Sequence, residues 1–157
     1  MRLTDLLTPD RVAIRHNDPG QPLDKPGALH ALAQMLTRGT ALEGGQVEKV
    51  LSERENLQST GIGEGVAIPH GAMPQLDNQQ ATLLIVPEGL DFAAIDNLAV
   101  NILFAVIGPK RATGEHLKTL ARVSRLLRNK AFRDRLVQAN DAETAYALIA
   151  AEEGDRR

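Results

Sequence analysis

Apolar residues recur at helical spacing in the first third of the chain. Between residues 28 and 36 they fall three or four positions apart, which predicts a helix with Asp24 as its cap and Gly39 at its end. A second helix is predicted over residues 45–57. The two are preceded by "HNDPGQPLDKPG" (16–27), which is short enough to be a connection within one domain.

The middle of the chain has the pattern of strands. "VAIPH" (66–70) alternates like a short strand, whereas "ATLLIVP" (81–87) and "VNILFAVIGP" (100–109) are largely apolar runs bounded by proline. Continuous apolar runs of this length are typical of strands that are covered on both faces.

The last part of the chain returns to helical spacing, in the segments 116–128, 131–139 and 141–152. Helices on both sides of a strand-rich middle favour an α/β fold in which a mixed β-sheet is sandwiched between α-helices. With 157 residues, 43 % of them hydrophobic, we expect one domain over residues 1–157.

No segment has the length of a membrane span. The longest apolar run, "LAVNILFAVIG" from Leu98, is shorter than the roughly 20 residues that cross a bilayer. We therefore expect a cytoplasmic protein without membrane insertion. The absence of cysteine excludes disulfides and thiolate ligands.

Charge is unevenly distributed, although the net charge is only −2. Residues 110–135 hold nine Lys or Arg against two acids, a stretch that attracts nucleic acid or an acidic protein, or is simply a solvated helix face. Three Phe and one Tyr are too few for the stacking surfaces of single-strand binders. We expect no nucleic-acid partner.

The segment "STGIGEGVAIPHG" (59–71) carries the first candidate site residues. Closely spaced glycines bring backbone N–H groups near an anion, and Ser59, Thr60, Gly61, Gly63 and Gly65 are the candidate phosphate-binding residues. The pattern differs from a dinucleotide fingerprint, because a strand follows the glycines where a helix is required.

His70 closes the predicted strand, between Pro69 and Gly71. We expect its imidazole to project from a rigid position at the strand's end. Most single histidines are structural or merely exposed, and His16 and His30 fit that description.

Two further residues fit a site around an anion. Arg54 stands seven positions after Val47 on an apolar helical stripe; an arginine facing the interior needs an acidic or phosphate partner, unless it extends from the stripe's edge to solvent. His116 opens the basic helix, and helix N-termini favour anions. The alternative for His116 is a surface histidine in a first turn.

Other chemistries lack their residues. Metal ligation by His70 and His116 would need further ligands, and neither histidine belongs to an H-x-x-x-H or H-E-x-x-H pair, so we expect no metal and no cofactor. Ser59 has no G-x-S-x-G context for a hydrolase. A histidine that itself accepts a phosphoryl group remains, with glycine amides and an arginine to stabilise the charge.

These segments resemble a known family. "RENLQSTGIGEGVAIPHG", "DFAAIDN", "VNILFAVIGP" and "HLKTLARVSRLLR" are similar to the enzyme IIA domain of the mannitol, fructose and nitrogen-regulatory types of the bacterial phosphotransferase system, over residues 3–150. The resemblance implies a mixed sheet flanked by helices, a phosphohistidine at Nε2 of His70, and supporting roles for Arg54 and His116.

Within that family, "AIPHG", "AIDN" and the absence of an attached membrane or carrier domain look most like the nitrogen-regulatory branch. That branch implies phosphorylation by a small histidine phosphocarrier protein and regulation of target proteins according to phosphorylation state. Two alternatives remain open: a sugar-uptake component that passes phosphate to a membrane permease, and a binding module without phosphate turnover. The expected docking surface surrounds His70 and includes Ile62, Met73 and Pro74.

Overall fold

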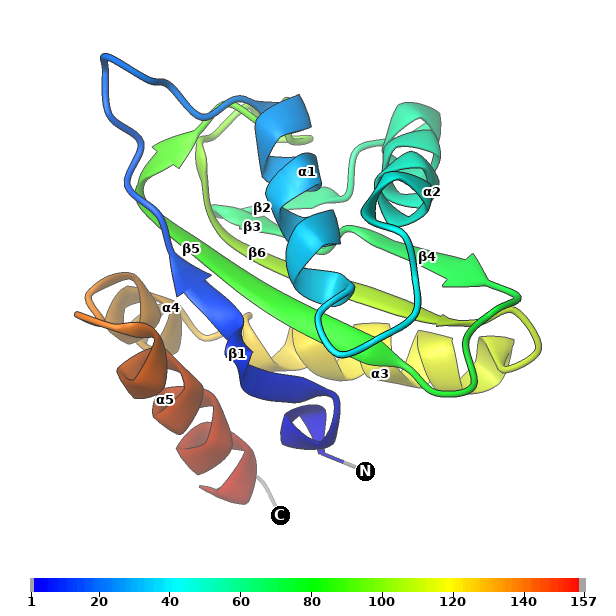
Figure 1. The fold of residues 1–157 in the computed structure, drawn as a ribbon. Coiled ribbons are helices and arrows are strands. Elements are labelled where there is room, and N and C mark those ends of the chain that lie inside the picture. The colour runs from blue at the N-terminus through cyan, green and yellow to red at the C-terminus, as the bar shows by residue number, and fades with distance from the viewer. Residues whose placement is uncertain (1, 156–157) are drawn as a thin grey trace.

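A computed structural model describes residues 2–155 and shows a mixed sheet between two helical layers (Figure 1). The strands are β1 (Leu7–Ile14), β2 (Gly61–Gly63), β3 (Val66–Ala67), β4 (His70–Met73), β5 (Gln80–Leu90) and β6 (Val100–Pro109). The helices are the 3-10 turn η1 (Leu3–Asp5), α1 (Lys25–Leu36), α2 (Gly44–Leu57), α3 (Thr113–Leu126), α4 (Lys130–Val137) and α5 (Ala142–Asp155).

The sheet is ordered β1-β5-β6-β3-β2, and β4 pairs with β6 farther along the edge that β3 also uses. β5 and β6 form the antiparallel centre, with Leu83 opposite Phe104. β1 runs parallel to β5, and β3 and β4 run parallel to β6. A single strand, β6, therefore aligns the two short strands that lead to and from residues 68 and 69.

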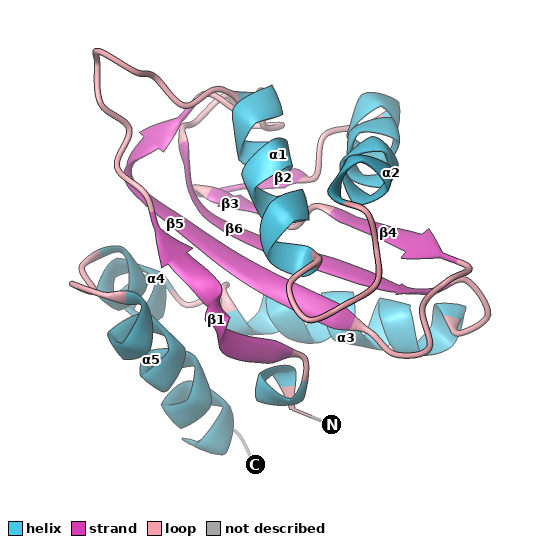
Figure 2. Ribbon diagram, in the orientation of Figure 1, coloured by secondary structure: helices cyan, strands magenta, loops and turns pink. Residues whose placement is uncertain are grey.

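Helices cover both faces of the sheet: α1 and α2 on one side, and α3, α4 and α5 on the other (Figure 2). Successive residues of β5 alternate between the two cores, Leu84 and Val86 packing under α1 and α2, and Leu83 and Ile85 on the opposite face. This double burial explains the continuous apolar runs of β5 and β6. The predicted sandwich of helices around a mixed sheet is confirmed.

One edge strand, β1, was not anticipated from the sequence. Its residues do not alternate: Leu7, Arg11 and Val12 are buried, and the three residues between Leu7 and Arg11 are exposed. Its pairing with β5 shifts register between Leu7 and Val12. It also contains Pro9, which lacks a donor and is tolerated at a sheet edge.

The predicted strand over residues 66–70 is divided in two, so the expectation of one continuous strand is wrong. β3 ends at Ala67 and β4 begins at His70. Pro69, which has no N–H for a ladder, lies between them, while its carbonyl accepts a hydrogen bond from the Val106 N–H at 3.0 Å. His70 thus begins a strand instead of ending one.

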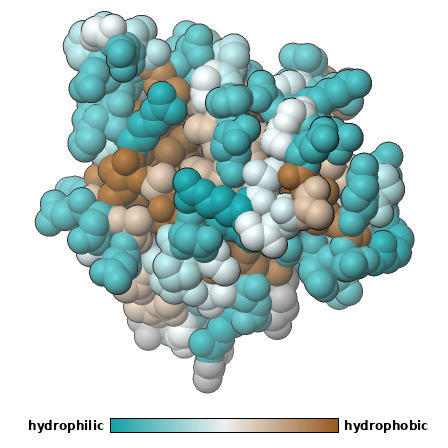
Figure 3. Space-filling model, in the orientation of Figure 1, coloured by the Kyte–Doolittle hydropathy of each residue, from teal (hydrophilic) through white to brown (hydrophobic). Residues whose placement is uncertain are grey.

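Hydrophilic side chains interrupt the apolar areas of the surface drawn in Figure 3. Among the described residues, the large exposed hydrophobic side chains are Leu57, Ile62, Ile95, Leu98 and Leu117. No helix within residues 2–155 combines the length and apolar character that a membrane crossing requires.

Candidate functional site

His70 is half-buried, and its ring is fixed by the backbone two residues earlier. Its Nδ1 lies 2.7 Å from the carbonyl oxygen of Ile68. Because a carbonyl only accepts hydrogen bonds, Nδ1 must carry the proton. Nε2 has no hydrogen-bond partner among residues 2–155. The neutral ring therefore presents an unengaged lone pair on Nε2.

The surroundings of His70 favour the neutral ring. Burial lowers the pKa of His70, the hydrogen bond to the Ile68 carbonyl raises it to a smaller extent, and the positive charge of Arg54 lowers it again. The net direction is below the ordinary histidine value. An imidazole that is uncharged near neutral pH is a competent nucleophile.

A cavity of about 310 Å³ opens beside His70, between the end of α2, strand β2 and helix α3. Its walls mix polar groups with apolar side chains. The lining residues are Arg54, Gln58, Ser59, Thr60, Gly61, Ile62, Ile68, His70, Ile95, Leu120 and Ser124. The sequence analysis did not single out Ile95, Leu120 and Ser124, because an isolated apolar or hydroxyl side chain gives no signal before the fold brings it to the cavity.

Arg54 lies in the last turn of α2 and contributes to this cavity. Its side chain is only partly buried, and one guanidinium nitrogen donates to the Gln58 carbonyl at 2.8 Å. The buried face of α2 is formed by Val47, Leu51 and Glu55. Of the two alternatives for Arg54, the structure therefore fits the arginine at the edge of the stripe, and the charged residue on the buried stripe is Glu55.

Glu55 is 5 % exposed and organises the segment that follows α2. Its carboxylate accepts from the Thr60 N–H at 3.0 and 3.1 Å and from the Thr60 hydroxyl, and pairs with Lys25 Nζ at 2.7 Å. Burial acts to raise the pKa of Glu55, but hydrogen bonds from Lys25, Thr60 and Ser59 hold it below its usual range. Glu55 stands four residues after Leu51, and this helical spacing could have indicated that it lies on the same buried face.

Ser59, Thr60 and Gly61 all line the cavity, as their proximity to His70 in the sequence suggested. Their donors are largely engaged within the protein, however. The N–H and hydroxyl of Thr60 bind Glu55, and the Gly61 N–H donates to Ser59 Oγ at 3.0 Å. These contacts give residues 59–61 a defined shape beside His70.

Gly63 and Gly65 lie outside this cavity's lining, in the turn between β2 and β3. Their φ angles are +102° and +84°, and Glu64 between them has a φ of +57°. These left-handed conformations favour glycine. The structure therefore places Gly63 and Gly65 where they form the tight turn.

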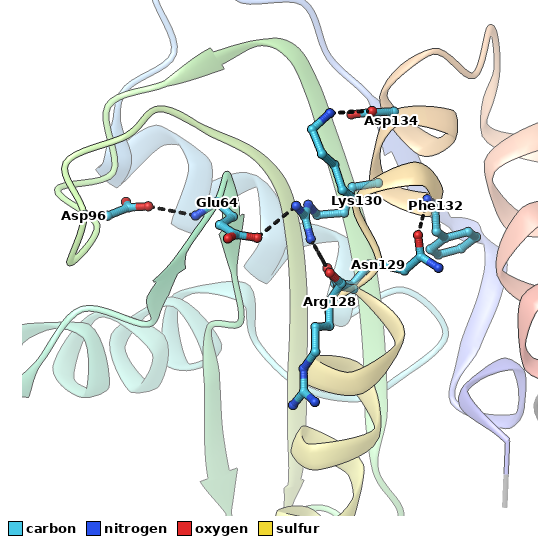
Figure 4. A network of polar contacts seen from close by, with 9 residues as sticks. Glu64, Asp96, Arg128, Asn129, Lys130, Phe132 and Asp134 are labelled. Carbon is cyan, nitrogen blue, oxygen red and sulfur yellow. Dashed lines mark hydrogen bonds and ion pairs between the residues drawn. The ribbon is translucent and has the colours of Figure 1, made fainter.

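Side-chain contacts (Figure 4) add to the backbone hydrogen bonds that the Gly65 carbonyl accepts from the N–H groups of Asn101 and Ile102, at 2.9 and 3.0 Å. The Glu64 N–H donates to an Asp96 carboxylate oxygen at 2.8 Å, and the Glu64 carboxylate accepts from Arg133 at 2.9 Å. Arg133 is itself buried and donates to the carbonyls of Leu127 and Arg128, at 2.9 and 2.7 Å. The turn is thereby tied to the junction between α3 and α4.

His116 lies near the start of α3, and its ring centroid is 5.7 Å from that of His70, with the planes tilted by 52°. It is 9 % exposed, so it is not the surface histidine of the alternative interpretation. Burial, and to a smaller extent the charge of His70, lower the pKa of His116. Leu120, one turn later on α3, reaches the cavity lining. The fold thus brings His70 and His116 together from segments 46 positions apart.

Comparison with known proteins adds to this geometry. Residues 8–152 match the family described as "Phosphoenolpyruvate-dependent sugar phosphotransferase system, EIIA 2". The chain belongs to this family. The resemblance inferred from the site motifs is confirmed.

Similar EIIA proteins include both regulatory and sugar-specific members. A nitrogen regulatory protein of Bradyrhizobium diazoefficiens is 34 % identical over 96 % of this chain and 95 % of that protein. A mannitol-specific phosphotransferase enzyme IIA component of Staphylococcus aureus is 35 % identical over 90 % of this chain and 92 % of that protein. The crystal structure of the nitrogen regulatory protein IIA-Ntr of Neisseria meningitidis superposes with a TM-score of 0.84 at 28 % identity, over 94 % of this chain and 98 % of that one.

The basic segment of this EIIA chain is largely engaged in ion pairs with other parts of the protein or within a helix. The pairs are Arg111–Asp77, Arg122–Glu153, Lys130–Asp134, Arg133–Glu64 and Arg135–Glu152. At least five of its nine cations therefore have acidic partners, which reduces the positive charge that the segment offers to an external ligand.

The remaining histidines of the EIIA chain lie on the surface. His16 Nδ1 pairs with Glu88 at 2.7 Å, and His30 Nδ1 pairs with Glu48 at 2.6 Å. Over residues 2–155, no group of three or more His, Cys, Asp or Glu side chains is arranged to hold a metal ion.

Proposed function

We propose that His70 accepts a phosphoryl group on Nε2 from the phosphohistidine of a small histidine phosphocarrier protein. The observation that carries this proposal is the 2.7 Å contact between Nδ1 and the Ile68 carbonyl, which leaves the Nε2 lone pair unengaged. In the transfer, Nε2 forms a bond to phosphorus as the donor's N–P bond breaks, and that bond's electron pair returns to the donor imidazole. The Ile68 carbonyl stabilises the positive charge that the His70 ring gains.

Arg54 and His116 are the proposed supporting groups. A guanidinium binds two phosphoryl oxygens at once through its planar fork, and Arg54 lies on the cavity beside His70. His116 donates from its ring on the other side of His70. Among the predicted phosphate-binding residues, Ser59, Thr60 and Gly61 shape the cavity wall, and Gly63 and Gly65 form the adjoining turn.

We further infer a regulatory role in which the phosphorylation state of His70 selects the protein partner. Ile62 and Ile95 line the cavity and are 45 % and 64 % exposed, so a partner is expected to bury them when it approaches His70. Met73, predicted to belong to that surface, is only 2 % exposed, and this part of the prediction is wrong. A phosphoryl group adds about two negative charges beside the apolar rim, which favours one partner and disfavours another.

The similarity to the mannitol-specific component supports a second candidate function, delivery of phosphate to a sugar permease in the membrane. The two candidates share the chemistry at His70 and differ in what receives the signal or the phosphate. A binding module that does not turn over phosphate is a third candidate, and it predicts no phosphorylation at all.

Phosphorylation is tested by incubating the protein with phosphoenolpyruvate, the first enzyme of the relay and the phosphocarrier, followed by intact-protein mass spectrometry. We expect a gain of one phosphoryl group that is acid-labile and base-stable. His70→Ala and His70→Gln should prevent it, and His30→Gln should leave it unchanged. Labelling of the His70 variants at the wild-type level would refute the assignment.

Partner selection is tested by adding the phosphorylated protein to cytosolic and membrane fractions of the source cell. The regulatory role predicts that some target proteins bind only one phosphorylation state, and that His70→Ala retains the partners of the unphosphorylated form. Transfer of the phosphate to a membrane permease component would establish the sugar-uptake function instead. Identical partners in both states would refute regulation by phosphorylation.

A further inference from the structure

Two buried polar atoms without partners lie around the same glycine, close to the site. Gln79 Oε1 and His116 Nδ1 are both buried, and neither has a hydrogen bond among residues 2–155. A Cβ placed on Gly108 would lie 3.2 Å from His116 Nδ1, 3.2 Å from Gln79 Cγ and 3.9 Å from Gln79 Cδ. Buried polar groups without partners are uncommon and costly, and each calls for an explanation.

The two side chains reach this position from different elements. Gln79 immediately precedes β5, whose Gln80 pairs with Ile107 of β6, so its backbone is held beside Gly108. His116 reaches it from the first turns of α3. Because residue 108 has no side chain, the space above it is shared by Gln79 and His116.

The atoms are also chemically complementary. An amide oxygen only accepts hydrogen bonds, whereas an imidazole nitrogen donates when it carries a proton. Within β6, over Val100–Pro109, no residue is charged, and β4 contributes His70. On α3 the neighbouring Glu115 and Lys118 are exposed. Gln79 Oε1 is thus a buried acceptor without a partner, on a side chain that shares the space at Gly108 with His116 Nδ1.

We propose that Gln79 is a positioning residue whose side-chain amide accepts a hydrogen bond from Nδ1–H of His116, fixing the ring so that Nε2 is the nitrogen offered toward His70. The consequence for phosphoryl binding rests on the function proposed above, whereas the hydrogen bond itself does not. The inferred contact resembles the one that Ile68 provides to His70, with a side-chain oxygen in place of a backbone oxygen.

This arrangement matters most once His70 carries phosphate. To donate to a phosphoryl oxygen, His116 Nε2 must be protonated. With Nδ1–H already held by Gln79, that requires a second proton, taken from solvent. The resulting imidazolium has a partner at each nitrogen, Gln79 Oε1 on one side and the phosphoryl group on the other. Gln79 thus stabilises the charged form of His116, which binds a dianionic phosphoryl group more strongly than the neutral Nε2–H tautomer does.

The hydrogen bond is tested in the unphosphorylated protein by ¹⁵N NMR of the histidine rings. We expect His116 of the wild type to carry its proton on Nδ1, and Gln79→Leu to move the proton to Nε2. Gln79→Glu, which keeps an acceptor, should retain Nδ1–H and raise the pKa of His116. Gln75→Leu, an exposed change in the same connection, is the control. The His70 tautomer, fixed by Ile68, reports whether each variant remains folded.

Phosphoryl transfer provides the second readout. Gln79→Leu should slow phosphorylation of His70 by about tenfold, and it should add no further loss in a His116→Gln background. An unchanged His116 tautomer in Gln79→Leu would overturn the proposal, as would additive losses in the double variant. If the wild-type protein is not phosphorylated at all, the function of His70 fails, and the tautomer measurement still decides the role of Gln79.

Discussion

The carboxylate of Glu55 lies 2.7 Å from the ammonium group of Lys25, which joins the last turn of α2 to the first residue of α1. The same ammonium group is 4.7 Å from the ring centroid of Phe92, in the loop that carries Ile95 to the cavity. Through Thr60, the carboxylate also fixes the backbone between α2 and β2. One buried ion pair therefore connects three parts of the structure next to His70.

Glu55→Gln is expected to destabilise the protein by about 1–3 kcal/mol, because charged hydrogen bonds to Lys25 and Thr60 are lost in a buried position. Urea unfolding followed by circular dichroism measures this change. Glu53→Gln on the same helix is the control, since Glu53 is exposed and its ion pair within residues 2–155 is a long one, with Lys49 at 3.9 Å. Equal stabilities for the two variants would contradict this role of Glu55.

The stabilising effect of Glu55 should depend on pH. The folded-state pKa of Glu55 is below that of an unfolded glutamate. Its contribution is therefore fully present above the unfolded value and is lost as the pH falls through the lower, folded-state value. The difference in unfolding free energy between wild type and Glu55→Gln should shrink over that acidic interval and stay constant at higher pH.

His16 should titrate at a higher pH than His70 and His116. Burial lowers the pKa of His70 and His116, whereas the hydrogen bond to Glu88 raises the pKa of His16. On lowering the pH in an NMR titration, His16 is expected to gain its proton before His70 and His116. A His70 that titrates together with or above His16 would contradict the buried, neutral ring.

The lowered pKa values of His70 and His116 also determine how stability changes with pH. His70 and His116 have lower pKa values in the folded protein than in the unfolded chain. Above the unfolded-state pKa both states hold the neutral ring and stability is unaffected, whereas stability falls as the pH drops from there toward the folded-state pKa values. Replacing His70 with Gln removes one group that must be charged inside the protein. The unfolding free energy of His70→Gln should accordingly decline less steeply between neutral and mildly acidic pH than that of the wild type.

The sequence predicted much of this fold, because the central strands are nearly continuous apolar runs and most helices have a clear hydrophobic period. Strands β5 and β6 are buried on both faces, so their apolar runs predicted them. Strand β1 could not be recognised in the same way, since Pro9 and Asp10 interrupt its pattern and only pairing with β5 makes it a strand. The β-strand propensity of residues 7–14 does not reveal an edge strand of this kind.

The site was predictable where its chemistry is local to a motif. His70 stands in a distinctive segment, and its partner Ile68 is two residues away. The roles of Glu55 and Gln79 depend on contacts with Lys25 and Gly108, over sequence separations that no periodicity reveals. The spacing could not decide between an interior-facing Arg54 and one at the edge of the stripe, because successive helical residues differ by about 100° and the next residue, Glu55, occupies the buried face.

Gly71→Ala is expected to push α2 away from the site. A Cβ at residue 71 would lie 2.2 Å from Val50 Cγ1, so the β-branched Val50 side chain, the helix or the strand must move. Overpacking of this kind costs about 1–3 kcal/mol, and Arg54, one turn after Val50, would be displaced from His70. The midpoint temperature of thermal unfolding and the rate of His70 phosphorylation should both decrease.

Gly45→Ala is the matched control for Gly71→Ala, because it lies on α2 with no atom within 4 Å of the added methyl group. Alanine has the higher helix propensity, so Gly45→Ala should stabilise the protein by about 0.5–1 kcal/mol. A Gly71→Ala variant as stable and as active as Gly45→Ala would show that α2 does not need this close approach.

Arg133→Lys is expected to loosen the turn at residues 63–65. Arg133 donates through one nitrogen to the carbonyls of Leu127 and Arg128 and through another to the Glu64 carboxylate. A lysine has a single nitrogen and cannot bridge both sites, so the link between the turn and the α3–α4 junction is lost, while the contacts of the turn with Asp96 and with β6 remain. We expect a loss of about 1–2 kcal/mol in unfolding free energy and faster hydrogen exchange at residues 61–66.

The exposed pair Lys130–Asp134, 2.8 Å apart on the same α4 helix, provides the control for Arg133→Lys. Lys130→Gln removes an i,i+4 contact that is open to solvent, and should change stability by no more than about 0.5 kcal/mol. Because β2 begins at Gly61 in the cavity wall, a loosened turn should also slow phosphorylation of His70 in Arg133→Lys and leave it unchanged in Lys130→Gln. Unaltered exchange at residues 61–66 in Arg133→Lys would show that Asp96 and the backbone hydrogen bonds to β6 hold the turn without Arg133, and would remove the link between the α3–α4 junction and the site.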